Sequence, residues 1–74
     1  MRVMLFGVLA ERAGTDRVEV EATSVDALRR ELEQRIPGLP RLSYAIAVDR
    51  VLVNDDRALS GNEEIALLPP FAGG

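Results

Sequence analysis

The residues best suited to chemistry are the last six, which carry no charged side chain and run Pro69-Pro70-Phe71-Ala72-Gly73-Gly74. We call this segment the tail. Proline fixes φ, lacks an N–H donor and favours an extended conformation in the preceding residue, so the tail should leave the domain extended. Glycine has no Cβ, so Gly73 and Gly74 could enter a channel too narrow for other residues. We expect the α-carboxylate of Gly74 to be the reactive group.

A carboxylate on a narrow arm is suited to acyl activation. Adenylation by ATP would convert it to a mixed anhydride with AMP as the leaving group, and a sulfur nucleophile could then displace AMP to leave a thiocarboxylate. The adenylating site and the site that finally accepts the sulfur would both have to admit the same terminus. Two glycines fit this requirement because neither has a Cβ that could clash in either site. Alternatively the two glycines are accidental, an event of about one chain in 200 at average composition. The prolines and the aromatic residue that precede them make chance a weaker explanation.

The residue types that are missing exclude other chemistry. The 74 residues include no His and no Cys, so the usual neutral-pH base, the commonest metal ligand and a thiol nucleophile are all absent. The acidic pairs Asp55-Asp56 and Glu63-Glu64 could be Mg²⁺ ligands, but turns explain them more simply. We therefore expect no metal site, no permanently bound cofactor and no catalysis by the chain alone. The adenylating machinery and the acceptor site must then come from partners.

Length and composition indicate one small globular domain. The formal net charge of −3 argues against a nucleic-acid partner, and 47% hydrophobic residues argue against disorder. An apolar stretch of about 18 residues, which a membrane span requires, is not present in the sequence. A soluble cytoplasmic protein is the expectation.

The hydrophobic pattern predicts the order strand, strand, helix, strand, strand, strand. The predicted strands are residues 3–9, 17–21, 44–48, 51–53 and 64–68, and residues 10–16 should be a polar connection. The predicted helix follows Thr23 and Ser24, either of which could cap it. Its apolar face comprises Val25, Leu28, Leu32 and Ile36. Pro37-Gly38 should end it, and Asp49-Arg50 should form a two-residue hairpin turn.

This order predicts an α+β fold in which a mixed sheet of about five strands packs on one main helix. The first and last strands should lie side by side and parallel at the centre of the sheet. The domain would span residues 1–68, and the tail, residues 69–74, would extend from it as a flexible Gly-Gly segment.

The same arrangement predicts an apolar surface on the sheet face opposite the helix. Met4, Phe6, Ala66 and Leu68 should lie there beside Phe71, because side chains alternate along a strand. A patch of this kind marks a protein interface, and we expect Met4, Phe6 and Leu68 to bind partners. The alternative is that Met4 and Phe6 are scattered surface residues or lie under a loop.

Several stretches together resemble a known family. They are Val3-Met4-Leu5-Phe6-Gly7, Glu11-Arg12-Ala13-Gly14, Ser24-Val25-Asp26-Ala27-Leu28 and the final run from Glu64 through Pro69-Pro70 to Gly73-Gly74. Over essentially its whole length the sequence resembles the ubiquitin-like β-grasp sulfur carriers, and most closely the small subunits of molybdopterin synthase. Asn62 replaces the usual turn glycine, and Phe71 replaces the usual valine of the tail.

The resemblance implies that Gly74 is adenylated and then thiocarboxylated. It implies three partners: a ubiquitin-activating-like adenylyltransferase that uses ATP and Mg²⁺, a sulfur donor protein, and a large synthase subunit that forms a heterotetramer with the carrier. The tail would enter the large subunit and supply sulfur to cyclic pyranopterin monophosphate. The Phe71 departure leaves open a carrier for another pathway (thiamine, tungsten cofactor or cysteine) or a ubiquitin-like protein modifier joined to targets through Gly74.

Overall fold

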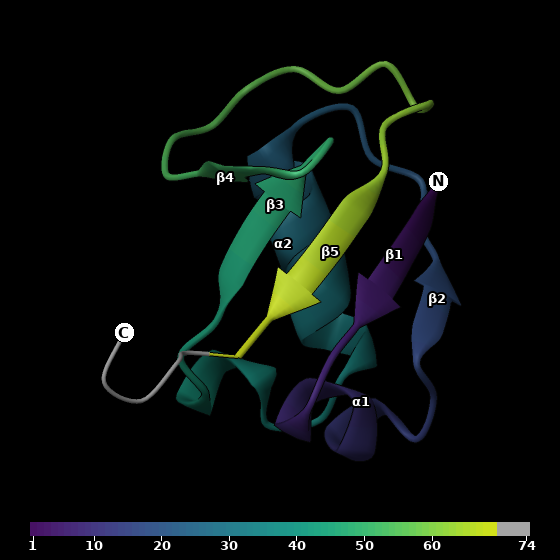
Figure 1. The fold of residues 1–74 in the computed structure, drawn as a ribbon, viewed down its shortest axis with the longest axis vertical. Helices are drawn as coiled ribbons and strands as arrows, with labels where there is room; N and C mark the ends of the chain where they lie inside the picture. Colours follow the sequence, from purple (N-terminus) through teal and green to yellow (C-terminus); the bar gives the residue numbers. More distant parts are fainter. Residues whose placement is uncertain (70–74) are drawn as a thin grey trace.

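The structure is a computed structural model that describes residues 1–69 of the 74. Its elements, in chain order, are β1 (Arg2–Leu5), α1 (Val8–Ala13), β2 (Arg17–Glu19), α2 (Val25–Arg35), a 3-10 turn (Leu39–Arg41), β3 (Ala45–Val48), β4 (Val51–Val53) and β5 (Ile65–Leu68) (Figure 1).

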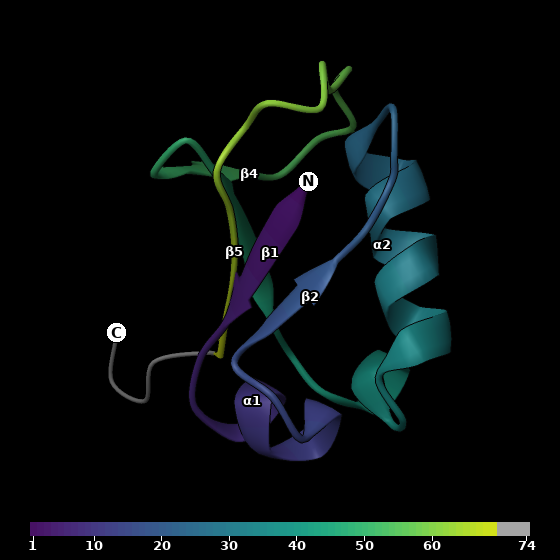
Figure 2. The ribbon, with the colours of Figure 1, turned by 90° about the vertical axis from the view of Figure 1, so that its right-hand side faces the viewer.

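Five strands form one sheet in the order β2-β1-β5-β3-β4. The central strands β1 and β5 are parallel, with Val3 opposite Ile65 and Leu5 opposite Leu67. The other neighbouring pairs are antiparallel. Helix α2 covers one face of the sheet, as the side view shows (Figure 2). The predicted α+β fold, with a mixed five-stranded sheet on one main helix, is confirmed.

The core lies between the sheet and α2. The apolar face predicted for the helix is buried, since Val25, Leu28, Leu32 and Ile36 are each at most 1% exposed. The alternate residues of the central strands meet this face, namely Val3, Leu5, Ile65 and Leu67. Ser24 is the helix cap, because its Oγ accepts a hydrogen bond from the N–H of Ala27 at 3.1 Å. Of the two candidate caps, the alternative Ser24 is therefore the correct one.

The first predicted strand was too long. It ends at Leu5, and residues 8–13, expected to be strand end and polar connection, form helix α1. The cause is Gly7, whose φ of 58° and ψ of −133° break the extended backbone. The N–H of Leu9 then donates to the carbonyl of Phe6 at 3.1 Å, closing a turn into the helix.

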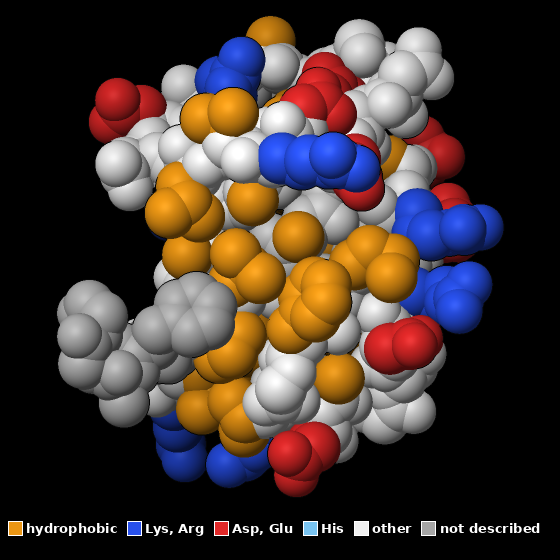
Figure 3. Space-filling model, viewed as in Figure 1, with side chains coloured by type: hydrophobic (Ala, Val, Ile, Leu, Met, Phe, Trp, Pro, Cys, Tyr) orange, Lys and Arg blue, Asp and Glu red, His pale blue; other side chains and the backbone are white. Residues whose placement is uncertain are grey.

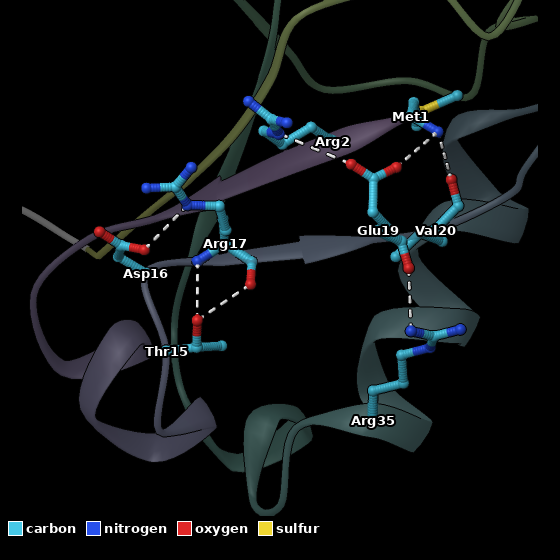
Figure 4. A network of polar contacts seen from close by, with 8 residues as sticks. All are labelled: Met1, Arg2, Thr15, Asp16, Arg17, Glu19, Val20 and Arg35. Atoms are coloured by element: carbon cyan, nitrogen blue, oxygen red, sulfur yellow. Dashed lines mark hydrogen bonds and ion pairs between the residues drawn. The ribbon is translucent and has the colours of Figure 1, made fainter.

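Other local predictions hold. Asp49 and Arg50 both have positive φ, 51° and 69°, so they form the two-residue turn between β3 and β4. At the opposite edge of the sheet, Glu19 and its neighbours tie β1, β2 and α2 together (Figure 4). Arg2 Nε lies 3.5 Å from Glu19 Oε1, and Arg35 Nη1 donates to the carbonyl of Glu19 at 2.9 Å.

Glu63 organises the turn before β5. Its carboxylate accepts hydrogen bonds from the N–H groups of Ser60 (2.7 Å) and Gly61 (2.9 Å). These bonds stabilise the charged form and lower the pKa of Glu63 from 4.5 to about 2. The glutamate is thus accounted for as a turn residue.

The lowered pKa of Glu63 predicts a pH effect on stability. A depressed folded-state pKa stabilises the fold above about pH 4.5, and that contribution is lost as the pH falls towards 2. We expect Glu63→Gln to flatten the decline of the unfolding free energy across this window. Urea unfolding at a series of pH values measures it, with Glu21→Gln as the control for removing one negative charge. Parallel curves for Glu63→Gln and the unaltered protein would contradict the prediction.

Candidate functional site

The tail begins where the central strand β5 ends. Pro69, its first residue, is half-buried and follows Leu68 directly. The predicted site residues Pro70, Phe71, Ala72, Gly73 and Gly74 lie outside the described residues. The reactive role expected of Gly74 therefore stays a prediction from the sequence.

A groove of about 690 Å³ lies on the sheet face opposite α2 and reaches the start of the tail. It is lined mainly by apolar side chains: Met4, Phe6, Ala45, Ala47, Arg50, Leu52, Glu64, Ala66, Leu68 and Pro69. We call it the outer groove. The space-filling view shows hydrophobic side chains gathered over this face of the sheet (Figure 3).

Strand register explains the shape of the outer groove. Met4 of β1 pairs with Ala66 of β5, Ala66 with Ala47 of β3, and Ala47 with Leu52 of β4. Alanine side chains are short, so the middle of this row is low, while Met4 and Leu52 stand higher at its two ends. A neighbouring row pairs Ala45 with Leu68. The hollow is therefore a direct result of alanine in the central strands.

The side chains in the outer groove are accessible to a partner. Phe6 is 45% exposed and Leu52 is 59% exposed, while Met4, Ala66 and Leu68 are half-buried. The structure thus brings Met4, Phe6 and Leu68 together, as the alternation along the strands predicted.

Ala45, Ala47 and Leu52 also line the groove, and the sequence alone did not predict this. They occupy alternate positions of two predicted strands, so the alternating pattern was present. Which distant residues they would face depended on the pairing of β3 with β5.

Charged side chains stand at the end of the outer groove away from the tail. Arg50 Nε lies 3.5 Å from Glu64 Oε1, and both side chains are exposed. An apolar centre with a polar rim is the usual composition of a protein docking surface. The arrangement suits recognition of a partner surface.

The titratable groups with shifted pKa values lie away from the groove. Burial, and then the hydrogen bond from its hydroxyl to Glu33 Oε2 at 3.0 Å, raise the pKa of Tyr44 to about 12. Neither Tyr44 nor Glu63 lines the outer groove. Asp56, one of the paired acids, accepts a hydrogen bond from the N–H of Asp26 at the start of α2. Among residues 1–69, no three acidic side chains come close enough to hold a metal ion.

No helix in the described part of the chain is both long enough and apolar enough to cross a membrane.

The fold is that of the small ubiquitin-like β-grasp proteins. The sequence profile of the ThiS family matches residues 3–74, so the chain belongs to the ThiS family. The resemblance noted from the sequence is confirmed.

Individual relatives agree with this assignment. The chain is 32% identical over 80 residues to the molybdopterin synthase sulfur carrier subunit of Escherichia coli K12, covering 100% of this chain and 99% of the relative. Among solved structures it is similar to SAMP1 from Haloferax volcanii, with a TM-score of 0.77 and 27% identity over 99% of this chain and 97% of the other. A structure of H. volcanii small archaeal modifier protein 1 gives a TM-score of 0.76, with 25% identity over 95% of each chain.

Proposed function

We propose that the chain is the sulfur carrier subunit of a molybdopterin synthase. The observation that carries the proposal is its full-length 32% identity to the carrier subunit of E. coli K12. The outer groove supports it, because a carrier that has no catalytic groups of its own must be recognised by the enzymes that act on it.

The proposed reaction uses the α-carboxylate of Gly74. A carboxylate oxygen attacks the α-phosphorus of ATP and releases pyrophosphate, which leaves an acyl adenylate on Gly74. Hydrosulfide (HS⁻) supplied by a donor protein then attacks the carbonyl carbon, expels AMP and loses its proton, forming the thiocarboxylate. ATP and Mg²⁺ belong to the adenylyltransferase partner, and the carrier contributes the acyl group alone.

The second half of the cycle takes place on the large synthase subunit. The tail inserts into the active site of that subunit, in a heterotetramer, and the thiocarboxylate supplies sulfur to cyclic pyranopterin monophosphate. We assign the docking of the folded domain to the outer groove, with Met4, Phe6 and Leu68 as contact residues. Because Pro69 lines the same groove, a partner bound there would meet the start of the tail.

A direct test starts from a carrier prepared chemically with a thiocarboxylate at Gly74, which bypasses the activating enzyme. Mixed with the large subunit from the same host and cyclic pyranopterin monophosphate, it should yield molybdopterin and return to the carboxylate form. The carboxylate form of the same chain is the matched control. If the large subunit binds the thiocarboxylated carrier yet forms no product, the proposed pathway is wrong.

The structural similarity to small archaeal modifier protein 1 favours a second function, protein modification through Gly74. In that case an amine of a target protein, instead of a sulfur nucleophile, would displace AMP. Denaturing gels of host extracts would then show covalent conjugates that contain this chain and disappear when Gly74 is deleted. A carrier for another sulfur-requiring pathway would form the same thiocarboxylate but would not support molybdopterin synthesis.

Phe71 provides a test of partner recognition by the tail. If its ring packs in the large subunit, Phe71→Ala should weaken binding by about 2 kcal/mol, the size typical of an aromatic hot spot. Isothermal titration against the large subunit measures the change, and Phe71→Val, the family's usual residue, should lose less. Equal affinity of the alanine variant and the unaltered chain would show that Phe71 is only a spacer.

A further inference from the structure

Gly7 and Pro69 meet at the end of the sheet where the tail begins. A Cβ placed on Gly7 would lie 3.1 Å from Pro69 Cγ and 3.9 Å from both Cβ and Cδ of the same ring. The proline ring therefore packs over the bare Cα of Gly7. A methyl group at position 7 would require the ring to shift by a few tenths of an ångström, and the φ of +58° disfavours a side chain there as well.

Strand pairing explains why these two residues meet. The parallel strands β1 and β5 place Leu5 opposite Leu67, and Gly7 and Pro69 each stand two residues further along. The backbone of Gly7 is held independently of the tail. Its carbonyl accepts hydrogen bonds from Ala10 (3.1 Å) and Glu11 (3.2 Å) in the first turn of α1. Gly7 is thus a fixed surface against which the first tail residue rests.

Pro69 has few ways to move from this position. Its own ring fixes φ, and the following proline restricts its ψ to extended values. The contact with Gly7 adds a third constraint, on the position of the ring itself. Together these constraints hold Pro69 in one position against Gly7.

We propose that Gly7 is a positioning residue for the reaction at Gly74: the absence of a side chain at position 7 seats Pro69 and so directs the tail towards a partner's active site. This inference rests on the proposed function, in which docking occurs at the outer groove and chemistry at Gly74. Rates of group transfer depend steeply on placement, and a misplacement of about 1 Å can cost about a hundredfold. A shift at the base of the tail would therefore appear in the rate of reaction within the bound complex.

The test compares kcat and KM for ATP–pyrophosphate exchange, catalysed by the adenylyltransferase of the same host with this chain as substrate. We expect Gly7→Ala to lower kcat about tenfold, with a smaller change in KM because the groove side chains remain. Gly14→Ala is the control for a Cβ added at positive φ in open space; because Gly7 differs from it in ψ (−133° against 13°), the double-mutant cycle below separates the Pro69 contact from backbone strain. Gly14 also has a positive φ, 75°, but nothing lies within 4 Å of an added Cβ there. We expect its kcat to be unchanged.

A double-mutant cycle separates this role from a general loss of stability. Pro69→Ala removes the ring and should itself lower kcat, and Gly7→Ala should then cost less than about twofold in that background. Equal fold-losses in the two backgrounds, a Gly14→Ala loss as large as that of Gly7→Ala, or an unchanged kcat for Pro69→Ala would each overturn the inference. The Pro69→Ala result decides the question alone if Gly7→Ala does not fold.

Failure of the proposed function would appear differently in the same assay. Exchange that persists after deletion of Gly74 would overturn the function, and the inference with it. Exchange that requires Gly74 but is insensitive to the Gly7 and Pro69 changes would overturn the inference alone.

Discussion

Deletion of Gly74 should abolish activation of the chain while leaving the folded domain unchanged. The deletion moves the terminal carboxylate back by one residue, about 3.5 Å of extended chain. An adenylating site that positions the carboxylate at the α-phosphorus would lose its near-attack geometry, so we expect a loss of at least about a hundredfold in pyrophosphate exchange. The core cluster lies wholly within residues 3–67, so the unfolding free energy should change by less than about 0.5 kcal/mol.

Two further chains sharpen the Gly74 experiment. Gly74→Ala keeps the length and the carboxylate but adds a Cβ, which tests the narrow-channel argument separately from reach. Addition of one glycine after Gly74 moves the carboxylate in the opposite direction. If the truncated chain supports ATP–pyrophosphate exchange at the same rate as the unaltered protein, the carboxylate of Gly74 is not the reactive group.

Leu67→Ala should be strongly destabilising, whereas Leu68→Ala, one residue further on, should not. Leu67 is fully buried on the core face of β5, between Leu5 of β1 and Ile46 of β3. Truncating a buried leucine removes apolar contact and leaves a cavity, at a cost of about 2–5 kcal/mol. A small domain has a total stability of about 5–15 kcal/mol, so this one change removes a large part of it. Leu68 is half-buried and lines the outer groove, so its replacement by alanine removes less apolar contact than the Leu67→Ala change does.

The pair also separates stability from binding. Urea unfolding measures the first, and titration with the large synthase subunit measures the second. We expect Leu68→Ala to weaken binding by about 1–2 kcal/mol with little effect on unfolding, and Leu67→Ala to show the reverse pattern when it is assayed below its melting temperature. Similar unfolding losses for the two variants would contradict the assignment of the two sheet faces.

Most of the fold could be predicted because several local patterns agreed. Four apolar residues at helical spacing defined α2, and Asp49-Arg50 marked the turn of a hairpin. Helix α1 could not be found in this way. Its first three residues, Val8, Leu9 and Ala10, continue the apolar run from β1, and Glu11 and Arg12 then indicate a polar connection. A short apolar run fits a buried strand as well as a helix. The decisive feature is the backbone of Gly7, whose conformation a sequence does not show.

Of the candidate site, too, one part could be predicted from the sequence and another part could not. Met4 and Leu68 could be placed on one face because β1 and β5 were expected at the centre of the sheet. The alternation of side chains along each strand then assigned both residues to the face opposite the helix. The hollow between them could not be predicted, because it depends on Ala66 meeting Ala47 across two strands far apart in sequence. The contact of Pro69 with Gly7 depends likewise on the register of the parallel pair.

The central claim is tested most directly by the intact mass of the chain after co-expression with the adenylyltransferase and sulfur donor of its own host. The account predicts a species heavier by the exchange of one oxygen for one sulfur, mapped by fragmentation to Gly74 and absent from the Gly74-deleted chain expressed in parallel. An unmodified mass under these conditions, or the same shift at any other residue, would contradict it.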